Sequence, residues 1–160
     1  MPRSGKVRKR VISPDPVYNS CQITRLVNKI MKDGKKQIAY KHVYKAMEII
    51  KNKDKDNEVM DVFHRALENI KPNMEVRSRR VGGAAYQIPV PVKGDKRESL
   101  AIRWLVQATR SRSNKEYHEF SEKLAAEILD ASQSQGGAVK KKEDNHKMAD
   151  ANRAFAHFRW

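Results

Sequence analysis

Residues 71–92, KPNMEVRSRRVGGAAYQIPVPV, constrain the fold of this chain more than any other segment. Apolar and polar side chains alternate on both sides of Gly82 and Gly83, a pattern typical of two strands joined by a tight turn. Pro89 and Pro91 have no N–H group, so the second strand is expected to lie at a sheet edge. An isolated two-stranded ribbon is only marginally stable in water. The segment is therefore expected to project from a larger body and to become ordered against a partner.

The segments on either side of the ribbon predict that this body is helical. Apolar residues recur at helical spacing in five segments, and a weaker sixth signal runs from about residue 139 to residue 154. The five sets are Ile23, Leu26, Val27, Ile30 and Met31; Ala39, Val43, Ala46, Met47 and Ile50; Val59, Phe63, Ala66, Leu67 and Ile70; Leu100, Ala101, Trp104, Leu105 and Ala108; and Tyr117, Phe120, Leu124, Ala125 and Ile128. The sequence predicts a mainly α fold, a single domain of about six helices with a protruding two-stranded antiparallel β-ribbon between helices three and four.

Capping residues predict where several of these helices begin and end. Short polar side chains are expected to open four helices, and a glycine and a proline are expected to end two. The expected caps are Asn19 or Ser20, Asp56 or Asn57, Asp95 paired with Glu98 in a capping box, and Asn114, and the expected ends are Gly34 and Pro72.

The charge of the chain indicates an anionic partner. There are 34 Lys and Arg residues against 19 Asp and Glu residues, which gives a formal net charge of +15. A charge of this size on 160 residues makes nucleic acid the leading partner. The N-terminal segment MPRSGKVRKR carries no apolar anchor for a membrane surface. Because the chain also has no signal-peptide core and no run of apolar residues that could span a bilayer, it is expected to be cytoplasmic.

Enzymatic and metal-binding functions are disfavoured. The Gly82–Gly83 pair is not followed by the GK[ST] sequence of a phosphate-binding loop, and no recognisable nucleophile motif is present. The five histidines lie on separate segments without an HExxH motif, and Cys21 is the only cysteine. We expect no catalysis, no cofactor, no metal and no small-molecule substrate.

Several long segments resemble those of one known family. SRRVGGAAYQIPVPV from Ser78, LAIRWLVQATR from Leu100 and AVKKKEDNHKMADANRAFAHFRW from Ala138 are similar to segments of ribosomal protein seven of the small subunit, bacterial type. The resemblance covers essentially the whole chain in order, although KNKDKDNEV and RSRSNKEYHEF depart from the family pattern. It implies a six-helix body with a β-ribbon. It also implies that the protein binds the major three-prime domain of small-subunit ribosomal RNA, nucleates assembly of the subunit head, and lies near messenger RNA, exit-site transfer RNA and neighbouring ribosomal proteins.

Charge pattern and resemblance together select the candidate contact residues. Residues 1–160 are expected to form one RNA-binding domain, with a basic N-terminal arm (1–18), the ribbon (72–92) and a basic C-terminal helix and tail (138–160). The candidate ribosomal RNA contacts are Arg3, Lys6, Arg8, Lys9, Arg10, Lys35, Lys36, Arg77, Arg79, Arg97, Arg110, Arg112, Lys140, Lys141, Lys142 and Lys147. The ribbon tip that is expected to face transfer RNA consists of Arg80, Val81, Gly82, Gly83 and Tyr86.

Two other functions are compatible with a helical body and a basic ribbon. An architectural DNA-bending protein would insert its ribbon into a minor groove, and duplex DNA would then compete with structured RNA at matched salt. A protein-interaction module would use Ile88, Val90 and Val92 as an open edge. Its binding would be nearly insensitive to salt, unlike a contact dominated by phosphates.

Overall fold

The computed structural model describes residues 11–54 and 57–158, which form six α-helices, a 3-10 helix and one two-stranded sheet. The helices are α1 (Cys21–Ile30), α2 (Lys36–Lys53), α3 (Val59–Ile70), α4 (Asp95–Ser111), α5 (Phe120–Ser132), α6 (Gly137–Ala151) and the 3-10 helix η1 (Arg153–Phe158). Strands β1 (Met74–Val81) and β2 (Ala84–Pro91) pair antiparallel between α3 and α4. The predicted fold class is confirmed.

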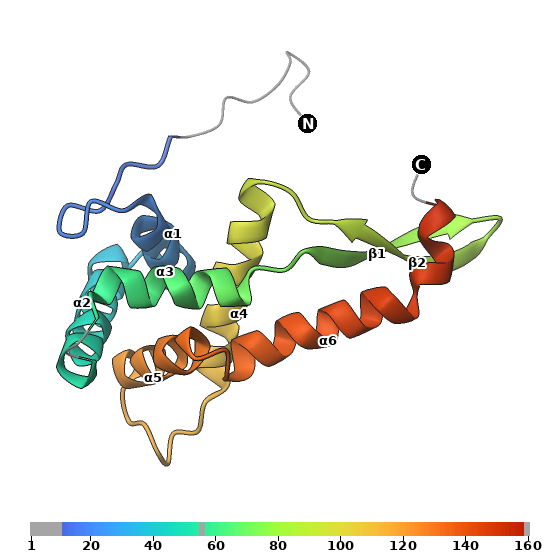
Figure 1. Cartoon of the computed structure of the whole chain (residues 1–160). Coiled ribbons are helices and arrows are strands. Elements are labelled where there is room, and N and C mark those ends of the chain that lie inside the picture. The colour runs from blue at the N-terminus through green and yellow to red at the C-terminus, as the bar shows by residue number, and fades with distance from the viewer. Residues whose placement is uncertain (1–10, 55–56, 159–160) are drawn as a thin grey trace.

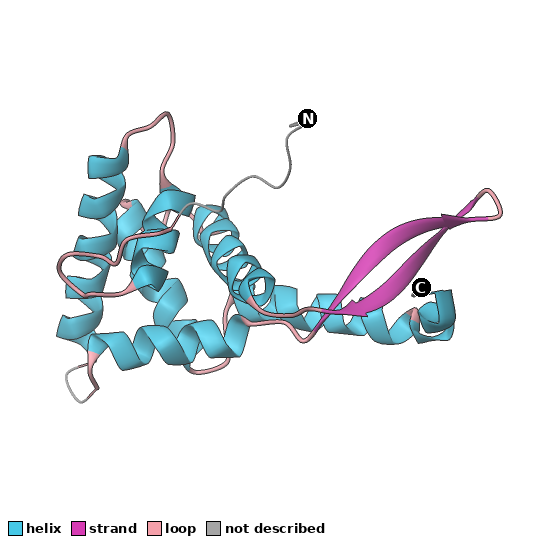
Figure 2. Ribbon diagram, turned by 90° about the horizontal axis from the view of Figure 1, so that it is seen from above, coloured by secondary structure: helices cyan, strands magenta, loops and turns pink. Residues whose placement is uncertain are grey.

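The described residues are arranged as a body and an arm (Figure 1). Helices α1 to α5 form the body. The arm consists of the ribbon (residues 73–92) with α6 and η1 (residues 137–158), since α6 leaves the body on the same side as the ribbon and η1 lies against β2. The turn at the end of the ribbon extends farther from the body than η1 does, as both Figure 1 and Figure 2 show.

The apolar core of the body lies between all five of its helices and the start of α6. The predicted stripes of α1, α2 and α3 are buried, except that Met31 follows α1 and Val59 is only partly buried. In α4, the predicted residues are buried except Leu100, which is only partly buried. Ile102 and Val106 are buried as well, because α4 packs against α1, α3, α5 and α6 and so buries more than one side. Tyr117, which was predicted to belong to the fifth helix, precedes α5.

Two of the predicted helix starts are wrong because the polar side chains concerned have other partners. Helix α4 begins directly after Gly94 without a side-chain cap, and the carboxylates of Asp95 and Glu98 bind Arg25 of α1 instead of forming a capping box. Helix α5 is opened by a capping box between Glu119 and Glu122. The predicted cap, Asn114, precedes α5, and its Oδ1 accepts a hydrogen bond from Lys123 Nζ instead.

The remaining helix ends follow the prediction more closely. Ser20 lies at the cap position of α1, although its side chain makes no cap hydrogen bond. Helix α3 begins after Glu58, while the amide of Asn57 donates to Asp54 and Asp56 lies outside the described residues. Helices α1 and α3 end before Gly34 and Pro72, as expected.

The register of the ribbon determines which side chains share a face. The pairing runs from Met74 opposite Pro91 to Val81 opposite Ala84, and the two-residue turn is closed by Gly82 and Gly83 at φ of +57° and +88°. Positive φ at both positions is what a tight hairpin turn with the twist of the strands requires, and glycine adopts it without strain.

Directly opposite residues lie on the same face of an antiparallel pair. Glu75, Arg77 and Arg79 of β1 therefore share a face with Val90, Ile88 and Tyr86 of β2. Met74 and Val76 lie on the other face. The two apolar rows that alternation predicts are thus on opposite faces of the ribbon.

Candidate RNA interface

The turn between α1 and α2 presents three lysines to solvent. Asp33 and Gly34 adopt positive φ values of +51° and +73°, which reverses the chain within a few residues. Lys32, Lys35 and Lys36 are all exposed, and the Lys36 ammonium lies 5.6 Å from the centre of the Tyr40 ring. Lys35 and Lys36 are candidate contacts from the sequence, whereas Lys32 is not. Only the geometry of the turn brings Lys32 into the same cluster.

Arg110 joins this cluster from the end of α4. Its Nη2 donates to the carbonyl oxygen of Ile30, 3.2 Å away, in the last turn of α1. The carbonyls at a helix end have no partner within the helix, so this bond satisfies one of them and also holds the guanidinium next to the turn. The structure therefore brings together Arg110 and Lys35, two predicted contacts that are far apart in the sequence.

A pocket of about 260 Å³ opens between these cations, and Lys32, Lys35 and Arg110 contribute to its lining. Its other walls are apolar and aromatic, and they include Phe120 and Ile38, whose residue surface is 51% exposed. A pocket with an apolar interior and a cationic rim matches the two parts of an unstacked nucleotide, since the base stacks on apolar surface and the phosphate pairs with lysine or arginine.

Two other candidate arginines, Arg97 in α4 and Arg112 directly after it, differ in their surroundings. Arg97 is partly buried, and its Nε has no hydrogen-bond partner among the described residues. Arg112 is half-buried between two carboxylates of α5: its Nε donates to Glu127 Oε2 at 2.6 Å, and its Nη2 binds Asp130. Burial by itself lowers the pKa of Arg112, but the two carboxylates outweigh it and hold the pKa above its ordinary value. Arg112 therefore links α4 to α5.

The ribbon carries its arginines on both faces. Arg77 and Lys96 both bind Glu75, a buried carboxylate at the base of β1. Burial alone raises the pKa of Glu75, but the hydrogen bonds from Lys96 and Arg77 dominate and bring the pKa below its ordinary value. Arg79 lies on the same face as Arg77, and Arg80 is exposed on the other. Arg77 is thus paired with a carboxylate of the protein, while its side chain remains about half exposed.

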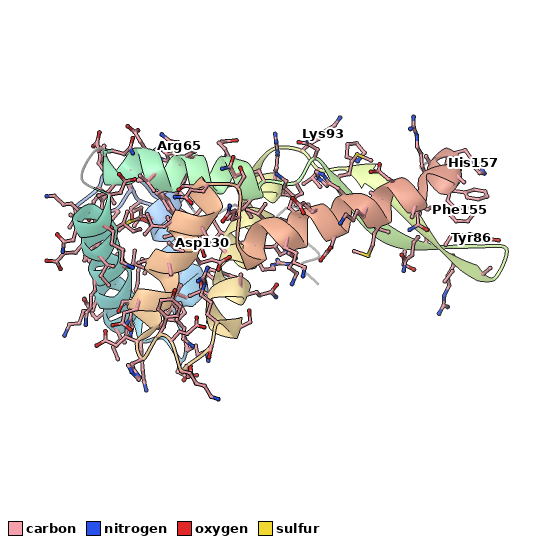
Figure 3. The ribbon with its side chains drawn as sticks, turned by 60° about the horizontal axis from the view of Figure 1, so that its bottom comes forward. Arg65, Tyr86, Lys93, Asp130, Phe155 and His157 are labelled. Atoms are coloured by element: carbon pink, nitrogen blue, oxygen red, sulfur yellow. The ribbon has the colours of Figure 1, made fainter. Side chains whose placement is uncertain are left out.

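Tyr86, a predicted tip residue, packs against η1. Its ring centre lies 5.3 Å from that of Phe155 and 5.5 Å from that of Phe158. Figure 3 shows Tyr86 and Phe155 facing each other near the far end of the arm. Gly82 and Gly83, in contrast, are exposed with open space around them. The tip is therefore divided into an exposed turn and a tyrosine that anchors β2.

The lysines of α6 also divide into two groups. Lys140, Lys141 and Lys147 are exposed, and Lys141 Nζ donates to Gln107 Oε1 of α4 at 2.7 Å. Lys142 is half-buried and its ammonium donates to the carbonyl oxygen of Asn69 at the end of α3. Lys142 therefore connects α6 to the segment that leads into the ribbon.

Some candidate residues and sites remain outside these surfaces. The N-terminal contacts Arg3, Lys6, Arg8, Lys9 and Arg10 and the terminal pair 159–160 lie outside the described residues.

Within residues 11–54 and 57–158, no group of three or more His, Cys, Asp and Glu side chains is arranged to hold a metal ion. In the same residues, no helix is both long and apolar enough to cross a membrane.

Comparisons with known proteins identify close relatives of the whole chain. A family model described as "Ribosomal protein S7p/S5e" matches residues 2–153. Proteins named "Small ribosomal subunit protein uS7" are similar to this chain over 160 residues, which is 100% of both sequences. Their identities are 55% for Ligilactobacillus salivarius, 57% for Caldicellulosiruptor saccharolyticus and 56% for Thermoanaerobacter pseudethanolicus.

Proposed function

This chain belongs to the ribosomal protein S7p/S5e family, and on that premise we propose that it is a structural, non-catalytic component of the small ribosomal subunit that binds ribosomal RNA. Membership in a ribosomal family also supports the expectation that the protein is not an enzyme. The observation that carries the RNA-binding role is the basic pocket of the body, where Lys32, Lys35 and Arg110 surround an apolar interior.

The geometry of this pocket suits a folded RNA better than a regular duplex. Sequence-specific proteins bind RNA mostly at loops and bulges, where unstacked bases are accessible. The pocket lies at the junction of four helices of the body. Arg110 is held on α4, and Lys32 and Lys35 lie in the tight turn that joins α1 to α2. We assign the pocket the main ribosomal RNA contact, and we assign the exposed lysines of α6, Lys140, Lys141 and Lys147, a second one.

The finer roles are also part of the proposal. The protein binds the major three-prime domain of the ribosomal RNA and nucleates assembly of the subunit head, with neighbouring ribosomal proteins around it. The exposed turn of the ribbon, with Arg80, Gly82 and Gly83, faces exit-site transfer RNA close to the messenger RNA path. This role is supported by the shape of the arm, since the turn projects beyond η1 and away from the body (Figure 2).

A salt titration of binding to a major three-prime domain fragment tests the RNA contact. Contacts to about six to ten phosphates lower the binding constant by roughly three to five decades between 50 and 200 mM salt. Changing Lys32, Lys35 and Lys36 to Gln should reduce the slope of log K against log salt by about one per lost phosphate contact. The control changes three exposed lysines elsewhere on α2, Lys41, Lys51 and Lys53, to Gln. Equal slopes for both triple variants would remove the pocket from the interface.

Two alternatives give different results in the same titration. A DNA-bending protein would bind duplex DNA as tightly as the RNA fragment at matched salt. A protein-interaction module would show no RNA affinity that depends on salt. The structure disfavours this second alternative, because Ile88 and Val92, which would form its docking edge, are already buried within the chain at 0% and 8% exposure.

The role of the ribbon tip can be tested without disturbing the rest of the arm. Arg79 and Tyr86 pair directly, so residues 80–85 can be replaced by a two-residue Asn-Gly turn that keeps the register and the contact of Tyr86 with η1. We expect the shortened protein to enter small subunits normally and to alter exit-site transfer RNA retention. Failure to assemble would make the tip an assembly contact, and unchanged retention would remove its transfer RNA role.

A further inference from the structure

One face of α6 holds the segment that leads from α3 into β1. Lys142 Nζ donates to the carbonyl oxygen of Asn69, and Asn145 Nδ2 donates to the carbonyl oxygen of Met74 at 2.7 Å. The backbone N–H of Asn73 donates to His146 Nε2 at 3.0 Å. Residues three and four apart lie on the same side of a helix, so Lys142, Asn145 and His146 can all bind the backbone of residues 69–74.

This stretch is the base of the ribbon. The carbonyl oxygen of Asn73 accepts the backbone N–H of Val92, 2.9 Å away, which ties the start of β1 to the end of β2. The contacts of Asn73 and Met74 with α6 therefore hold both strands at the point where they leave the body. A small rotation at this base would displace the turn at the far end of the ribbon much more than the base itself.

Besides these bonds, the ribbon is held by the ion pair between Glu75 and Lys96 at its base and by the packing of Tyr86 against η1. Ile88 and Val92 are buried, but Met74, Val76 and Val90 are only partly so. The hydrogen bonds from α6 have a defined geometry, which apolar burial lacks, so they restrict the direction of the ribbon more than its apolar contacts do.

We propose that Asn145 and His146 are positioning residues that fix the direction of the ribbon relative to the body, and that His146 does so only while its imidazole ring is uncharged. The proposal rests on the proposed function, because it names the residues that set the direction of the ribbon tip. The requirement for an uncharged ring follows from the direction of the hydrogen bond, in which the Asn73 N–H donates and His146 Nε2 accepts. A ring nitrogen that accepts an N–H has a free lone pair, whereas both nitrogens of a charged imidazolium are donors. Protonation of His146 therefore replaces an acceptor by a donor that faces the Asn73 N–H.

The elements that pack against α6 bring further charged and titratable groups to this region. They include Lys142, Glu143, Lys147 and Asp150 on α6 itself, Lys71 and Glu75 on the segment around the ribbon base, Tyr86 and Lys93 on and after β2, and Arg153 and His157 on η1. The sign of the effect on the ribbon follows from the bond itself, because the docked base requires a ring nitrogen that accepts a hydrogen bond. Docking is therefore expected to weaken as the pH falls.

The bond itself can be observed by nuclear magnetic resonance on the full-length protein labelled with ¹⁵N. A scalar coupling across the hydrogen bond between the Asn73 amide nitrogen and His146 Nε2 is expected at pH 8. It should be absent when the ring is charged, because an imidazolium has no lone pair to accept with, so the measurement is repeated at about pH 5.5. Exchange of the Asn73 amide with solvent, corrected for its intrinsic pH dependence, should become roughly two- to tenfold faster, as loss of one such bond implies.

Three variants separate positioning from simple stabilisation. His146→Gln keeps an acceptor that does not titrate, so the protection of Asn73 should remain and become independent of pH. His146→Ala should lose the protection at both pH values. His64→Gln removes an exposed histidine on α3 and should behave as the wild type. If the wild type shows no coupling at pH 8, or if His146→Ala leaves the protection of Asn73 unchanged, the proposal is overturned.

The direction of the ribbon is measured by the distance between two spin labels, on Arg80→Cys at the tip and Lys51→Cys on the body, in a Cys21→Ser background. We expect a narrow distance distribution for the wild type at pH 8, a broad one at pH 5.5, and a narrow one at both values for His146→Gln. A distribution that stays narrow in His146→Ala would contradict the positioning role. Failure of the proposed function would instead appear as absence of RNA binding in the wild type, with these two measurements unaffected.

Discussion

The body and the arm of this protein are held together by different forces. In the body, apolar side chains from five helices form one core, with Phe63, Leu105 and Ile128 each exposed by less than 2%. In the arm, the ribbon contributes mainly Ile88 and Val92 to buried apolar surface. Its position depends on hydrogen bonds from α6 and on the contact of Tyr86 with η1. Apolar burial gives stability without direction, whereas hydrogen bonds have defined geometry. Apolar burial therefore accounts for the stability of the body, and directional contacts account for the orientation of the arm.

The ion pairs of the two regions differ in the same way. In the body, Arg112 binds Glu127, which is exposed by only 1% and also accepts the backbone N–H of Ala138 at the start of α6. This network fixes α4, α5 and α6 relative to one another. In the arm, Glu75 forms ion pairs with Arg77 and Lys96 at the base of the ribbon, and both cations remain about half exposed. The first network links parts of the core, and the second anchors an extended element.

The largest difference in stability is expected between alanine substitutions of two isoleucines that are equally buried. Ile128 in α5 and Ile88 in β2 are both 0% exposed. Ile128→Ala should lower the free energy of unfolding by about 2 to 5 kcal/mol, the usual range for a buried isoleucine. Ile88→Ala should change it by less than about 1 kcal/mol, because the arm can open locally before the body unfolds. Urea denaturation followed by circular dichroism measures both, and equal losses would show that arm and body unfold as one unit.

The second prediction concerns two arginines, Arg103 in α4 and Arg112 directly after it, that differ in their partners. Arg112→Ala leaves the buried carboxylate of Glu127 without its cation and should cost about 3 kcal/mol of stability. Arg103→Ala, at an exposed position, should change stability by less than about 0.5 kcal/mol. Thermal unfolding of the two variants gives the comparison. If Arg112→Ala were as stable as the wild type but bound RNA more weakly, the result would support the sequence-based prediction that Arg112 contacts RNA directly.

A smaller effect is expected at the far end of the arm. Tyr86→Ala removes the ring that packs against Phe155 and Phe158 and should cost about 1 kcal/mol of local docking energy, as aromatic pairs typically contribute. Amide hydrogen exchange in η1 should therefore accelerate about fivefold, while exchange in the body stays constant. Tyr86→Phe keeps the ring and serves as the control. Faster exchange in the core of the body would mean that the two regions are coupled more tightly than their contacts indicate.

The smallest effect is the acid response of the ribbon base. The pKa of Glu75 is below its ordinary value in the folded protein, so its ion pairs stabilise the ribbon above the pH at which the unfolded carboxyl titrates, about 4.3 for a free Glu. This stabilisation is lost as the pH falls through the lower, folded value. Amide chemical shifts of β1 recorded between pH 6 and pH 3 follow the transition. Glu75→Gln should abolish it while retaining the ribbon, and an unchanged transition in that variant would assign it to another group.

Much of the fold follows from local patterns. The 3.6-residue spacing of apolar side chains locates all six α-helices, and the alternation around Gly82 and Gly83 locates the ribbon, because both patterns depend on neighbouring residues alone. The helix caps are less predictable. Asp95 and Glu98 match a capping box in sequence, yet they bind Arg25, and only the packing of α4 on α1 places that arginine within reach.

The candidate interface shows the same division. Charge pattern and family resemblance identify Lys35, Arg110 and Lys142 as candidate RNA contacts, but they do not distinguish cations that face solvent from those that have partners inside the protein. The fold places Lys35 and Arg110 at one pocket, together with Lys32, which sequence reasoning missed. It directs Lys142 to the carbonyl of Asn69 instead. An acceptor in another helix leaves no signal in the local sequence.

The amino-acid sequence by itself therefore determined the elements, their order, the turn of the ribbon and the strong positive charge, all of which depend on residue type and short-range spacing. Only the packed structure shows the course of α6 along the ribbon and the partner of each charged side chain. These features depend on contacts between residues far apart in the chain. Each polar group takes the partner that the packing of the helices brings within hydrogen-bonding distance.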